Sequence, residues 1–247
     1  MYNFFIDKLN ITADKRVHIF GKDFNHIKNV LRMKKGEQFL VSFENSSSLC
    51  ELDCYTEESV VAKILQENFQ DTSLPIEIYL FQGLPKSDKL ELIVQKTVEL
   101  GVDGIIPVEM SRSIVKIEEK KKEAKTQRWQ LIAESAAKQS KRTLIPKVFE
   151  PITFKQSLSK LQEMDLLLVP YESKNGMSDT LSALKCIKAG SKVGIVIGPE
   201  GGFEQGEINA LTQIGGKTIS LGKRILRTET ASITAVGMLM LYAETSL

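Results

Sequence analysis

A glycine-rich loop that follows an apolar stretch is the first place where this sequence could support chemistry. The segment VGIVIGPEGGF (residues 193–203) has four aliphatic residues in its first five and then runs into Gly-Pro-Glu-Gly-Gly. Glycine lets backbone N–H and C=O groups approach a flat ligand closely, because it has no side chain. The loop is therefore a candidate ligand site, although a plain strand-to-helix turn, with Glu204 and Glu207 near the helix start, would suit the same residues.

Two further loops end predicted strands and belong with the first. They are residues 169–172 (Val-Pro-Tyr-Glu) and residues 221–228 (Leu-Gly-Lys-Arg-Ile-Leu-Arg-Thr). Ligands of open α/β sheets bind outside the carboxyl ends of the strands, so the three loops are expected to meet at one edge. The chain has no G-x-x-x-x-G-K-[ST] pattern and no early G-x-G-x-x-G pattern. P-loop nucleotidases and Rossmann-type dinucleotide enzymes or methyltransferases are therefore poorly supported.

The elements that must position these loops alternate between strand and helix after Pro75. Apolar runs predict the strands, and an apolar period of 3.6 predicts helices such as residues 87–101, with Asp88 and Glu91 as a capping box and Gly101 as the stop. Such alternation is typical of an α/β domain with a mainly parallel sheet. The predicted strands are residues 76–82, 104–109, 165–172, 192–198 and 217–222, and the predicted helices are residues 87–101, 126–140, 177–188, 204–214 and 229–244.

The N-terminal part has a different pattern, in which short apolar runs alternate with turn-like pieces. We therefore expect two domains, a small β-rich one over residues 1–71 and the α/β one over residues 72–247, with residues 71–75 as the linker. The predicted elements of the first domain are strands at 39–44 and 59–65, a hairpin loop at 45–48, and a short helix at 23–37 with Ile27, Val30 and Leu31 on one face.

The charges of the chain are unevenly distributed, although the formal net charge is only +2. Residues 1–36 hold eight Lys/Arg against three Asp/Glu, and residues 111–147 hold eleven against four. The run Lys120-Lys121-Lys122 alone suits a solvated loop. Two basic blocks on a nearly neutral protein instead indicate two surfaces that face one polyanion, and together they favour nucleic acid.

The histidines and cysteines exclude several kinds of chemistry. Three cysteines do not make a disulfide framework. Cys50 and Cys54 are four apart, but no second pair of cysteines or histidines stands at a zinc-ligand spacing, so no metal site is expected. With both histidines near the N-terminus, a Ser-His-Asp or Cys-His triad is poorly supported. The chain shows no signal peptide and no apolar run long enough for a membrane span. We therefore expect a cytoplasmic protein without membrane partners.

The final predicted helix is apolar nearly all round. Residues 231–243 read ASITAVGMLMLYA, and a helix of this kind is expected to be buried on every side. Its small residues Ala231, Ser232, Ala235 and Gly237 allow close helix packing. Burial within one domain and burial against a second protein chain both remain open from this pattern.

Several segments together resemble one family of RNA-modifying enzymes. The segments IGPEGGF and SLGKRILRTETA resemble the C-terminal signature of the SPOUT methyltransferases, and more narrowly that of the bacterial small-subunit ribosomal RNA uridine-N3 methyltransferases. The resemblance extends to HIKNVLRMKKGE, KSDKLELIVQKTVELGVDGIIPVEMSRS and RWQLIAESAAKQSKR. It covers most of the chain, whereas residues 40–70 carry little family signal.

The resemblance implies a fold and a set of partners. It implies a PUA-like β-barrel that helps to hold RNA, and a SPOUT-type parallel sheet with a C-terminal trefoil knot whose loops bind S-adenosylmethionine. It also implies a homodimer built through the last helix and small-subunit ribosomal RNA as the substrate. The cofactor-binding residues that it implies are Pro170, Tyr171, Gly198, Pro199, Glu200, Gly201, Gly202, Leu221, Gly222, Ile225, Leu226 and Thr228.

The implied reaction is transfer of a methyl group to N3 of one uridine in 16S ribosomal RNA. The base is expected to flip into the pocket, and its N3 proton must be removed. Arg227 is the candidate for stabilising negative charge on a uracil oxygen or for holding a phosphate. Glu229 or Glu200 is the candidate for accepting the proton. A local salt bridge is the plainer interpretation of Arg227 and Glu229. The candidate RNA contacts, each equally compatible with ordinary surface charge, are Arg32, Lys34, Lys35, Arg112, Lys138 and Arg142.

Two other functions remain compatible with the same residues. A related SPOUT enzyme could methylate a ribose 2′-hydroxyl or a transfer RNA base, and would then tolerate a uridine blocked at N3. A non-catalytic ribosome assembly factor could keep the fold without binding the cofactor. The intact residues Gly198, Glu200, Gly202, Arg227 and Glu229 favour an enzyme.

Overall fold

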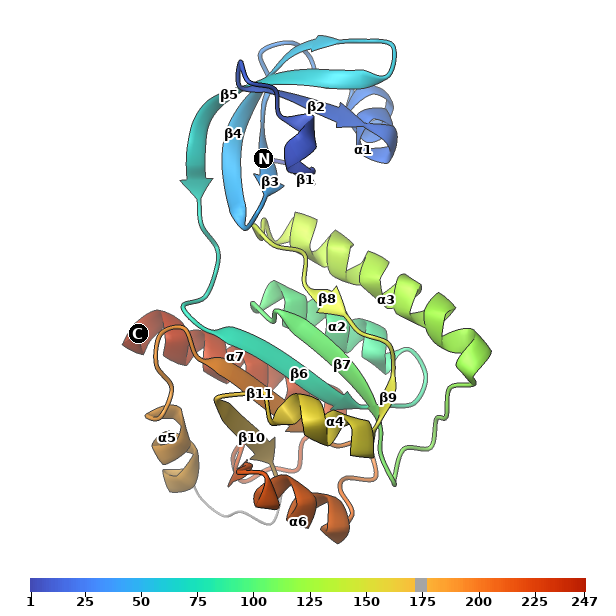
Figure 1. The fold of residues 1–247 in the computed structure, drawn as a ribbon, viewed down its shortest axis with the longest axis vertical. Helices are drawn as coiled ribbons and strands as arrows, with labels where there is room; N and C mark the ends of the chain where they lie inside the picture. Colours follow the sequence, from blue (N-terminus) through green and yellow to red (C-terminus); the bar gives the residue numbers. More distant parts are fainter. Residues whose placement is uncertain (172–176) are drawn as a thin grey trace. The chain divides into compact units, whose positions relative to one another are not determined.

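The chain forms two compact units, and the computed structural model describes residues 1–171 and 177–247 (Figure 1). The first unit comprises residues 1–73 and 137–145, and the second comprises residues 74–136 and 146–247. Residues 137–145 lie between two segments of the second unit in the chain, yet they belong to the first unit. There Asn3 Nδ2 donates a hydrogen bond to the carbonyl of Arg142 at 2.9 Å, and Lys138 pairs with Asp23 at 3.0 Å. The predicted boundary at residue 71 stays a prediction.

The first unit is built on a curled five-stranded sheet, as expected for a small β-rich domain. The strand order is β1-β3-β4-β5-β2, with β1 parallel to β3 and the other pairs antiparallel. Phe4, Phe39, Cys50 and Val60 lie in its buried core. The elements of this unit are β1 (Asn3–Phe5), η1 (Lys8–Asn10), β2 (Arg16–Phe20), α1 (Gly21–Asn25), η2 (His26–Leu31), β3 (Gln38–Phe43), β4 (Ser46–Tyr55) and β5 (Ser59–Gln70).

The predicted hairpin loop at residues 45–48 is wrong in its position. The turn consists of Glu44 and Asn45, whose φ angles are +46° and +62°. Two central residues with positive φ make a primed turn, whose twist matches that of the flanking strands. Three serines that the composition assigned to the loop therefore begin β4 instead.

The predicted helix at residues 23–37 is also wrong in its form and length. A short α1 is followed by η2, a π-helix, and the helical segment ends at Arg32, which has a φ of +53°. A π-helix closes its hydrogen bonds between residues five apart, so its side chains do not follow the period of 3.6. Ile27 is buried as predicted, whereas Val30 is 66% exposed.

The second unit contains a parallel sheet, and every predicted strand after Pro75 is confirmed. The strand order is β12-β10-β11-β6-β7-β8, and β9 also pairs with β7. The sequence pattern did not predict β8, β9 or α4. The strands are β6 (Glu77–Gly83), β7 (Gly104–Glu109), β8 (Lys147–Val148), β9 (Ile152–Thr153), β10 (Leu166–Pro170), β11 (Lys192–Ile197) and β12 (Lys217–Ile219).

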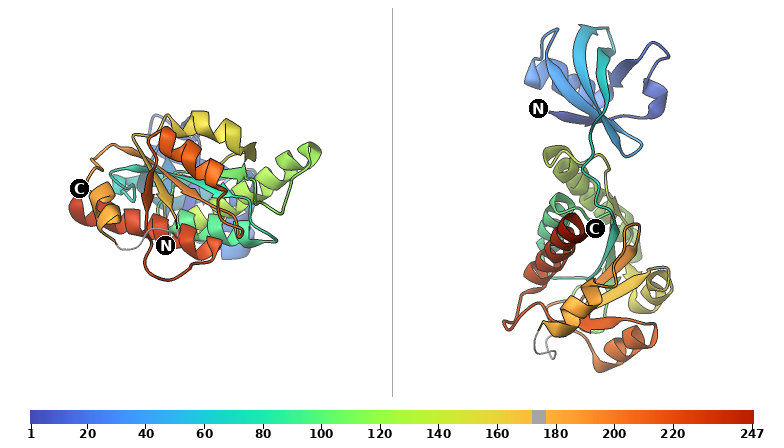
Figure 2. Two further views of the ribbon diagram at one scale, coloured as in Figure 1. Left: turned by 90° about the horizontal axis from the view of Figure 1, so that it is seen from below. Right: turned by 90° about the vertical axis from the view of Figure 1, so that its left-hand side faces the viewer.

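Helices cover both faces of this sheet (Figures 1 and 2). On one face α7 packs against α2, β6 and β11. On the other face α4 and α6 place Leu161, Ile208 and Leu211 against Phe81 and Val196 of the strands. The helices are α2 (Lys89–Glu99), α3 (Glu119–Gln139), α4 (Phe154–Leu161), α5 (Ser178–Leu184), α6 (Gln205–Gln213) and α7 (Thr228–Ser246). The trefoil knot stays a prediction.

The structure confirms the buried face of α2 but corrects its N-terminus. The helical period predicts a buried face made of five residues, and all of them are buried: Leu90, Ile93, Val94, Thr97 and Val98. Asp88 is the N-cap residue, yet its side chain makes no capping hydrogen bond. The capping-box prediction is therefore wrong, and the carboxylate of Glu91 pairs with Arg128 at 2.8 Å instead.

The last helix is buried on one side only within this chain, so the second unit does not bury it on every side. Ser232, Ala235, Val236 and Leu239 are buried against the sheet and α2. Leu241 is 58% exposed on the other side. The second unit by itself therefore leaves part of this apolar helix uncovered.

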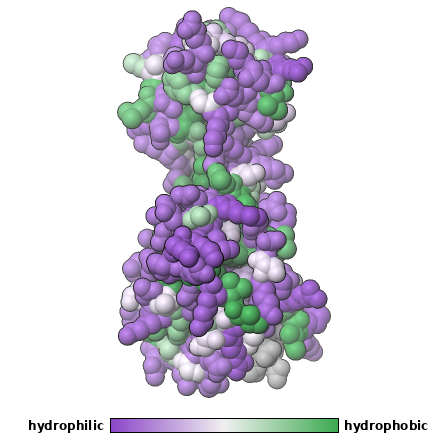
Figure 3. Space-filling model, turned by 90° about the vertical axis from the view of Figure 1, so that its right-hand side faces the viewer, coloured by the Kyte–Doolittle hydropathy of each residue, from purple (hydrophilic) through white to green (hydrophobic). Residues whose placement is uncertain are grey.

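The face drawn in Figure 3 carries mainly hydrophilic side chains, with hydrophobic ones in small groups between them. None of the helices in the described ranges is long and apolar enough to cross a membrane.

The three cysteines differ in their expected reactivity. Cys50 is buried, and burial raises the pKa of its thiol to about 12, whereas Cys54 and Cys186 are exposed. Since the thiolate is the reactive species, a maleimide at pH 7.5 should label two thiols in the folded protein and the third only after unfolding. Mass spectrometry of the intact protein checks this result. Rapid labelling of Cys50 in the folded protein would contradict the buried position.

Candidate functional site

A cavity of about 630 Å³ lies at the carboxyl ends of the parallel strands in the second unit. Pro170 ends β10, Ile197 ends β11 and Ser220 follows β12, and all three residues line the cavity. Small-molecule sites typically occupy about 300–1,000 Å³, so the cavity can hold a ligand of nucleoside size. The position is the one that the sheet topology predicts for a ligand site.

The structure brings the predicted loops together at this cavity. Glu172, the last residue of the predicted loop at residues 169–172, lies outside the described residues. All twelve residues predicted to bind the cofactor line the cavity: Pro170, Tyr171, Gly198, Pro199, Glu200, Gly201, Gly202, Leu221, Gly222, Ile225, Leu226 and Thr228.

The glycine loop depends on its glycines for two separate reasons. Gly202 has a φ of +69°, in the left-handed region that side chains disfavour. At Gly201 an added Cβ would lie 2.9 Å from Cβ of Arg112, so a side chain has no room there. Arg112 also holds the loop, because it donates hydrogen bonds to the carbonyl of Gly201 at 3.1 Å and to Glu204 Oε1 at 2.7 Å. The hydrogen bond with Glu204 raises the pKa of Arg112.

A buried polar network fastens the same loop to the sheet and to the last helix. The hydroxyl of Thr228 donates to the carbonyl of Gly198 at 2.7 Å and accepts from Gln82 Nε2 at 2.9 Å. Ser232 in turn donates to Gln82 Oε1. Gln82 and Ser232 are fully buried, and Thr228 is 5% exposed. The network therefore joins the ends of β6 and β11 to the first turn of α7.

Glu200 is held by groups of the loop between β6 and α2. Its carboxylate accepts hydrogen bonds from Lys89 Nζ at 2.9 Å and from the backbone N–H of Lys86 at 3.1 Å. Burial raises the pKa of Glu200, but the hydrogen bonds from Lys89 and from backbone N–H groups outweigh it, so the net pKa lies below its usual range. A carboxylate of lowered pKa is a weaker proton acceptor.

Arg227 and Glu229 have different positions relative to the cavity. Arg227 is exposed, lines the cavity and forms no ion pair with the residues that the structure describes. Glu229 is not part of the lining. Its Oε2 atom lies 3.5 Å from Lys89 Nζ, and it is buried without a hydrogen-bond partner among the described residues.

The remaining predicted RNA contacts lie in the first unit, apart from Arg112. Arg32 and Lys34 are exposed, and Lys35 pairs with Asp53 at 3.0 Å. Lys138 pairs with Asp23, and Arg142 is 6% exposed. The roles of all six cations in RNA binding stay predictions.

Sequence reasoning missed part of the cavity wall, most clearly Lys89. This residue begins α2, directly after the loop that follows β6. The rule that ligand sites form where parallel strands end applies to β6 as well and would have pointed to it. The cavity residues that the sequence analysis did not assign to a site are Lys89, Ile197, Phe203, Glu204, Gln205, Ser220, Arg224 and Ala231.

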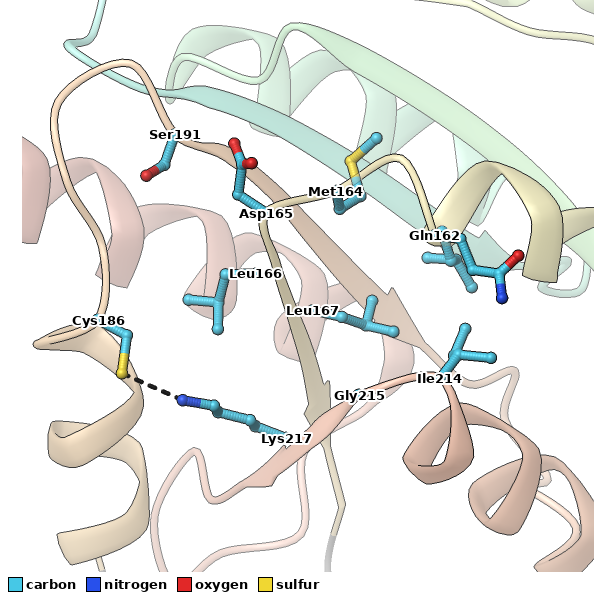
Figure 4. A pocket seen from close by; sticks show the side chains of 11 residues that line it. Gln162, Met164, Asp165, Leu166, Leu167, Cys186, Ser191, Ile214, Gly215 and Lys217 are labelled. Atoms are coloured by element: carbon cyan, nitrogen blue, oxygen red, sulfur yellow. Dashed lines mark hydrogen bonds between the residues drawn. The ribbon is translucent and has the colours of Figure 1, made fainter.

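A second cavity, of about 490 Å³, lies near the opposite ends of β10 and β12 (Figure 4). Its polar groups largely bond to protein groups: Lys217 Nζ donates to Cys186 Sγ at 3.1 Å, and Asp165 accepts from the backbone N–H of Lys192 at 2.8 Å. Among the described residues no group of three His, Cys, Asp or Glu side chains could hold a metal ion.

Comparison with known proteins first defines the class. Residues 72–240 match the sequence family of the RNA methyltransferase domain, and residues 21–52 match the RNA methyltransferase PUA domain. A fold of one parallel α/β unit and one PUA-like β unit is therefore that of a two-domain RNA methyltransferase, as the sequence analysis expected.

The similarity to curated proteins then narrows the class. Ribosomal RNA small subunit methyltransferase E of Bacillus subtilis is 39% identical over 99% of this chain and 98% of its own. The chain belongs to the ribosomal RNA small subunit methyltransferase E family. A structure of the Neisseria gonorrhoeae member, described as bound to S-adenosyl methionine, is 29% identical with a TM-score of 0.82, covering 98% of this chain and 97% of that one. A Legionella pneumophila putative methyltransferase in complex with the same cofactor is 28% identical with a TM-score of 0.81, covering 97% of both chains.

Proposed function

We propose that this protein is an S-adenosylmethionine-dependent methyltransferase that methylates N3 of a specific uridine in 16S ribosomal RNA. The single observation that carries this proposal is the cavity at the carboxyl edge of the sheet, where all twelve predicted cofactor residues meet and Arg227 stands exposed beside them. Family membership supports ribosomal RNA methylation, and the N3 position rests on the resemblance of the sequence motifs.

The residues that line the cavity are suited to binding S-adenosylmethionine. In the described part of the chain, the backbone N–H and C=O groups of Leu221 and Leu226 make no hydrogen bond to protein, although both residues line the cavity. Free backbone donors and acceptors beside apolar side chains suit the edges and faces of an adenine ring. The left-handed backbone at Gly202 and the close packing at Gly201 shape the neighbouring wall. When bound, the cofactor supplies an electrophilic methyl group on a sulfonium.

The protein's own residues must align uracil N3 with that methyl group and favour loss of the N3 proton. Arg227 suits this task, because its guanidinium is always charged and has no carboxylate partner among the described residues. We assign to it the stabilisation of negative charge on a uracil oxygen. The lowered pKa of Glu200 and the position of Glu229 outside the cavity lining favour a positioning role over proton transfer for both.

We also propose a homodimer formed through α7. The uncovered side of this helix carries Leu241, which is 58% exposed, and the half-buried Met238. Large apolar side chains that a unit leaves on its surface support a protein interface at that place.

Calorimetric titration with S-adenosylmethionine, followed by methylation of isolated small subunits, tests the proposed function. Saturable binding and a methylated uridine that nucleoside mass spectrometry identifies as the N3 derivative are expected. A 2′-O-methylated product would instead indicate the related enzyme. Absence of cofactor binding, with and without small subunits, would favour the assembly factor.

Arg227→Ala should separate the two parts of the site. Methyl transfer should fall about a hundredfold, since removal of one group that stabilises developing negative charge costs about this much. Cofactor binding should change little, because the predicted role of Arg227 is toward the RNA. Lys223→Ala, which removes an exposed charge outside the cavity lining, should have a smaller effect on transfer. Equal losses in the two variants would contradict a specific role for Arg227.

A further inference from the structure

Lys89 lies where three elements of the second unit meet at the cavity. It begins α2, its ammonium is 2.9 Å from Glu200 Oε1 in the glycine loop, and it is 3.5 Å from Glu229 Oε2 in the first turn of α7. Its side chain is 31% exposed and lines the cavity. The two carboxylates raise the pKa of Lys89, with the hydrogen bond to Glu200 as the main cause, so the side chain stays charged.

The two carboxylates depend on Lys89 to different degrees. Glu200 also accepts a hydrogen bond from the backbone N–H of Lys86, so it keeps one partner without the ammonium. Glu229 Oε2 is buried and has no hydrogen-bond partner among the described residues, which leaves the ion pair with Lys89 as its charge compensation. A buried carboxylate that loses its counter-charge is unfavourable. Removal of Lys89 therefore takes the ammonium away from both carboxylates and leaves Glu229 Oε2 without a counter-charge among the described residues.

We propose that Lys89 is a positioning residue of the methyl-transfer site, which joins Glu200 and Glu229 and so holds the loop of residues 198–202 in the conformation that forms the cavity. This inference rests on the proposed function. Ion pairs then tie the loop, α2 and α7 together at their solvent side, while the network of Gln82 and Thr228 ties the loop and α7 to β6 in the interior. The ammonium acts through the two carboxylates and not as an acid or base.

Lys89→Met should weaken binding of S-adenosylmethionine about tenfold or more in calorimetric titration, because the loop must be ordered against two unpaired carboxylates. The matched control is Lys96→Met on the same helix. Lys96 pairs with Glu99 at 2.9 Å and does not line the cavity, so its variant should bind like the wild type.

Two further variants distinguish positioning from general damage to the fold. Lys89→Arg keeps the charge and should restore most of the affinity. Adding Glu200→Gln to Lys89→Met should recover part of the lost affinity, because the added change removes one of the two unpaired charges while keeping an acceptor for the N–H of Lys86.

The outcomes separate this inference from the function on which it rests. A wild-type protein that does not bind S-adenosylmethionine would overturn the proposed function. A wild-type protein that binds, with Lys89→Met matching Lys96→Met in affinity and differing only in melting temperature, would overturn the positioning role alone. So would a Lys89→Arg variant as weak as Lys89→Met.

Discussion

Gly202→Val should weaken binding of S-adenosylmethionine up to about thirtyfold. The φ of Gly202 is +69°, and an L-residue in this region costs about 1–2 kcal/mol, with β-branched residues at the unfavourable end. An added Cβ would meet no atom within 4 Å, so the effect comes from the backbone and not from a clash. The free loop can relax to another conformation, and the strain must then be overcome on binding. Calorimetric titration measures the change in dissociation constant.

Two controls isolate the backbone effect at Gly202. Asparagine tolerates the left-handed region better than valine, so Gly202→Asn should retain most of the affinity. Gly206→Val places the same side chain in the nearby α6, where φ is not positive and no atom lies within 4 Å of an added Cβ. This variant should bind nearly normally. If Gly202→Asn loses as much affinity as Gly202→Val, the explanation by φ is wrong.

Thr228→Val should destabilise the second unit by about 3 kcal/mol. The substitution keeps the shape but removes the hydroxyl that donates to the carbonyl of Gly198 and accepts from Gln82. Both groups lie in a buried network, and each buried polar group left without a partner costs about 1–3 kcal/mol. The melting temperature should therefore fall by roughly 6–12 °C, which differential scanning calorimetry measures.

The matched control is Thr245→Val near the exposed end of the same helix. Its hydroxyl bonds to the carbonyl of Leu241 and to the hydroxyl of Ser246, and both bonds are exposed to solvent, so stability should change by less than about 0.5 kcal/mol. Equal melting temperatures for the two variants would show that the network around Thr228 does not stabilise the fold. The loss of the bond to Gly198 should also weaken cofactor binding, because that carbonyl belongs to the glycine loop.

Local sequence patterns were sufficient for most elements of the second unit, though not for β8, β9 and α4, and for the place of its cavity. The buried face of α2 follows from apolar residues at a helical period, and the cavity follows from loops that end parallel strands. These properties depend on residues close together in the chain and on a general rule of sheet topology. The prediction that residues 193–203 form a strand and a ligand loop was therefore possible without an alignment.

Patterns of composition failed where the backbone took an uncommon local form. The turn at Glu44 and Asn45 requires two positive φ angles, which three following serines obscured. The π-helix at residues 26–31 does not have the period on which the assignment of Val30 to a buried face relied. The capping box at Asp88 is absent because the backbone there, with φ of −87° and ψ of 13°, is not in the extended conformation of a capping residue; the carboxylate of Glu91 pairs with Arg128 instead.

The sequence by itself determined the fold class, the family and the loops that make the site. Only the tertiary structure decided what individual side chains do there. In the structure Glu200 accepts a hydrogen bond from the backbone N–H of Lys86, and Glu229 forms an ion pair with Lys89. Arg227 lines the cavity without an ion pair to the described residues. The partners of Glu200, for example, are 111 and 114 residues away in the chain, and such contacts and the burial of the groups are established only by the packed structure.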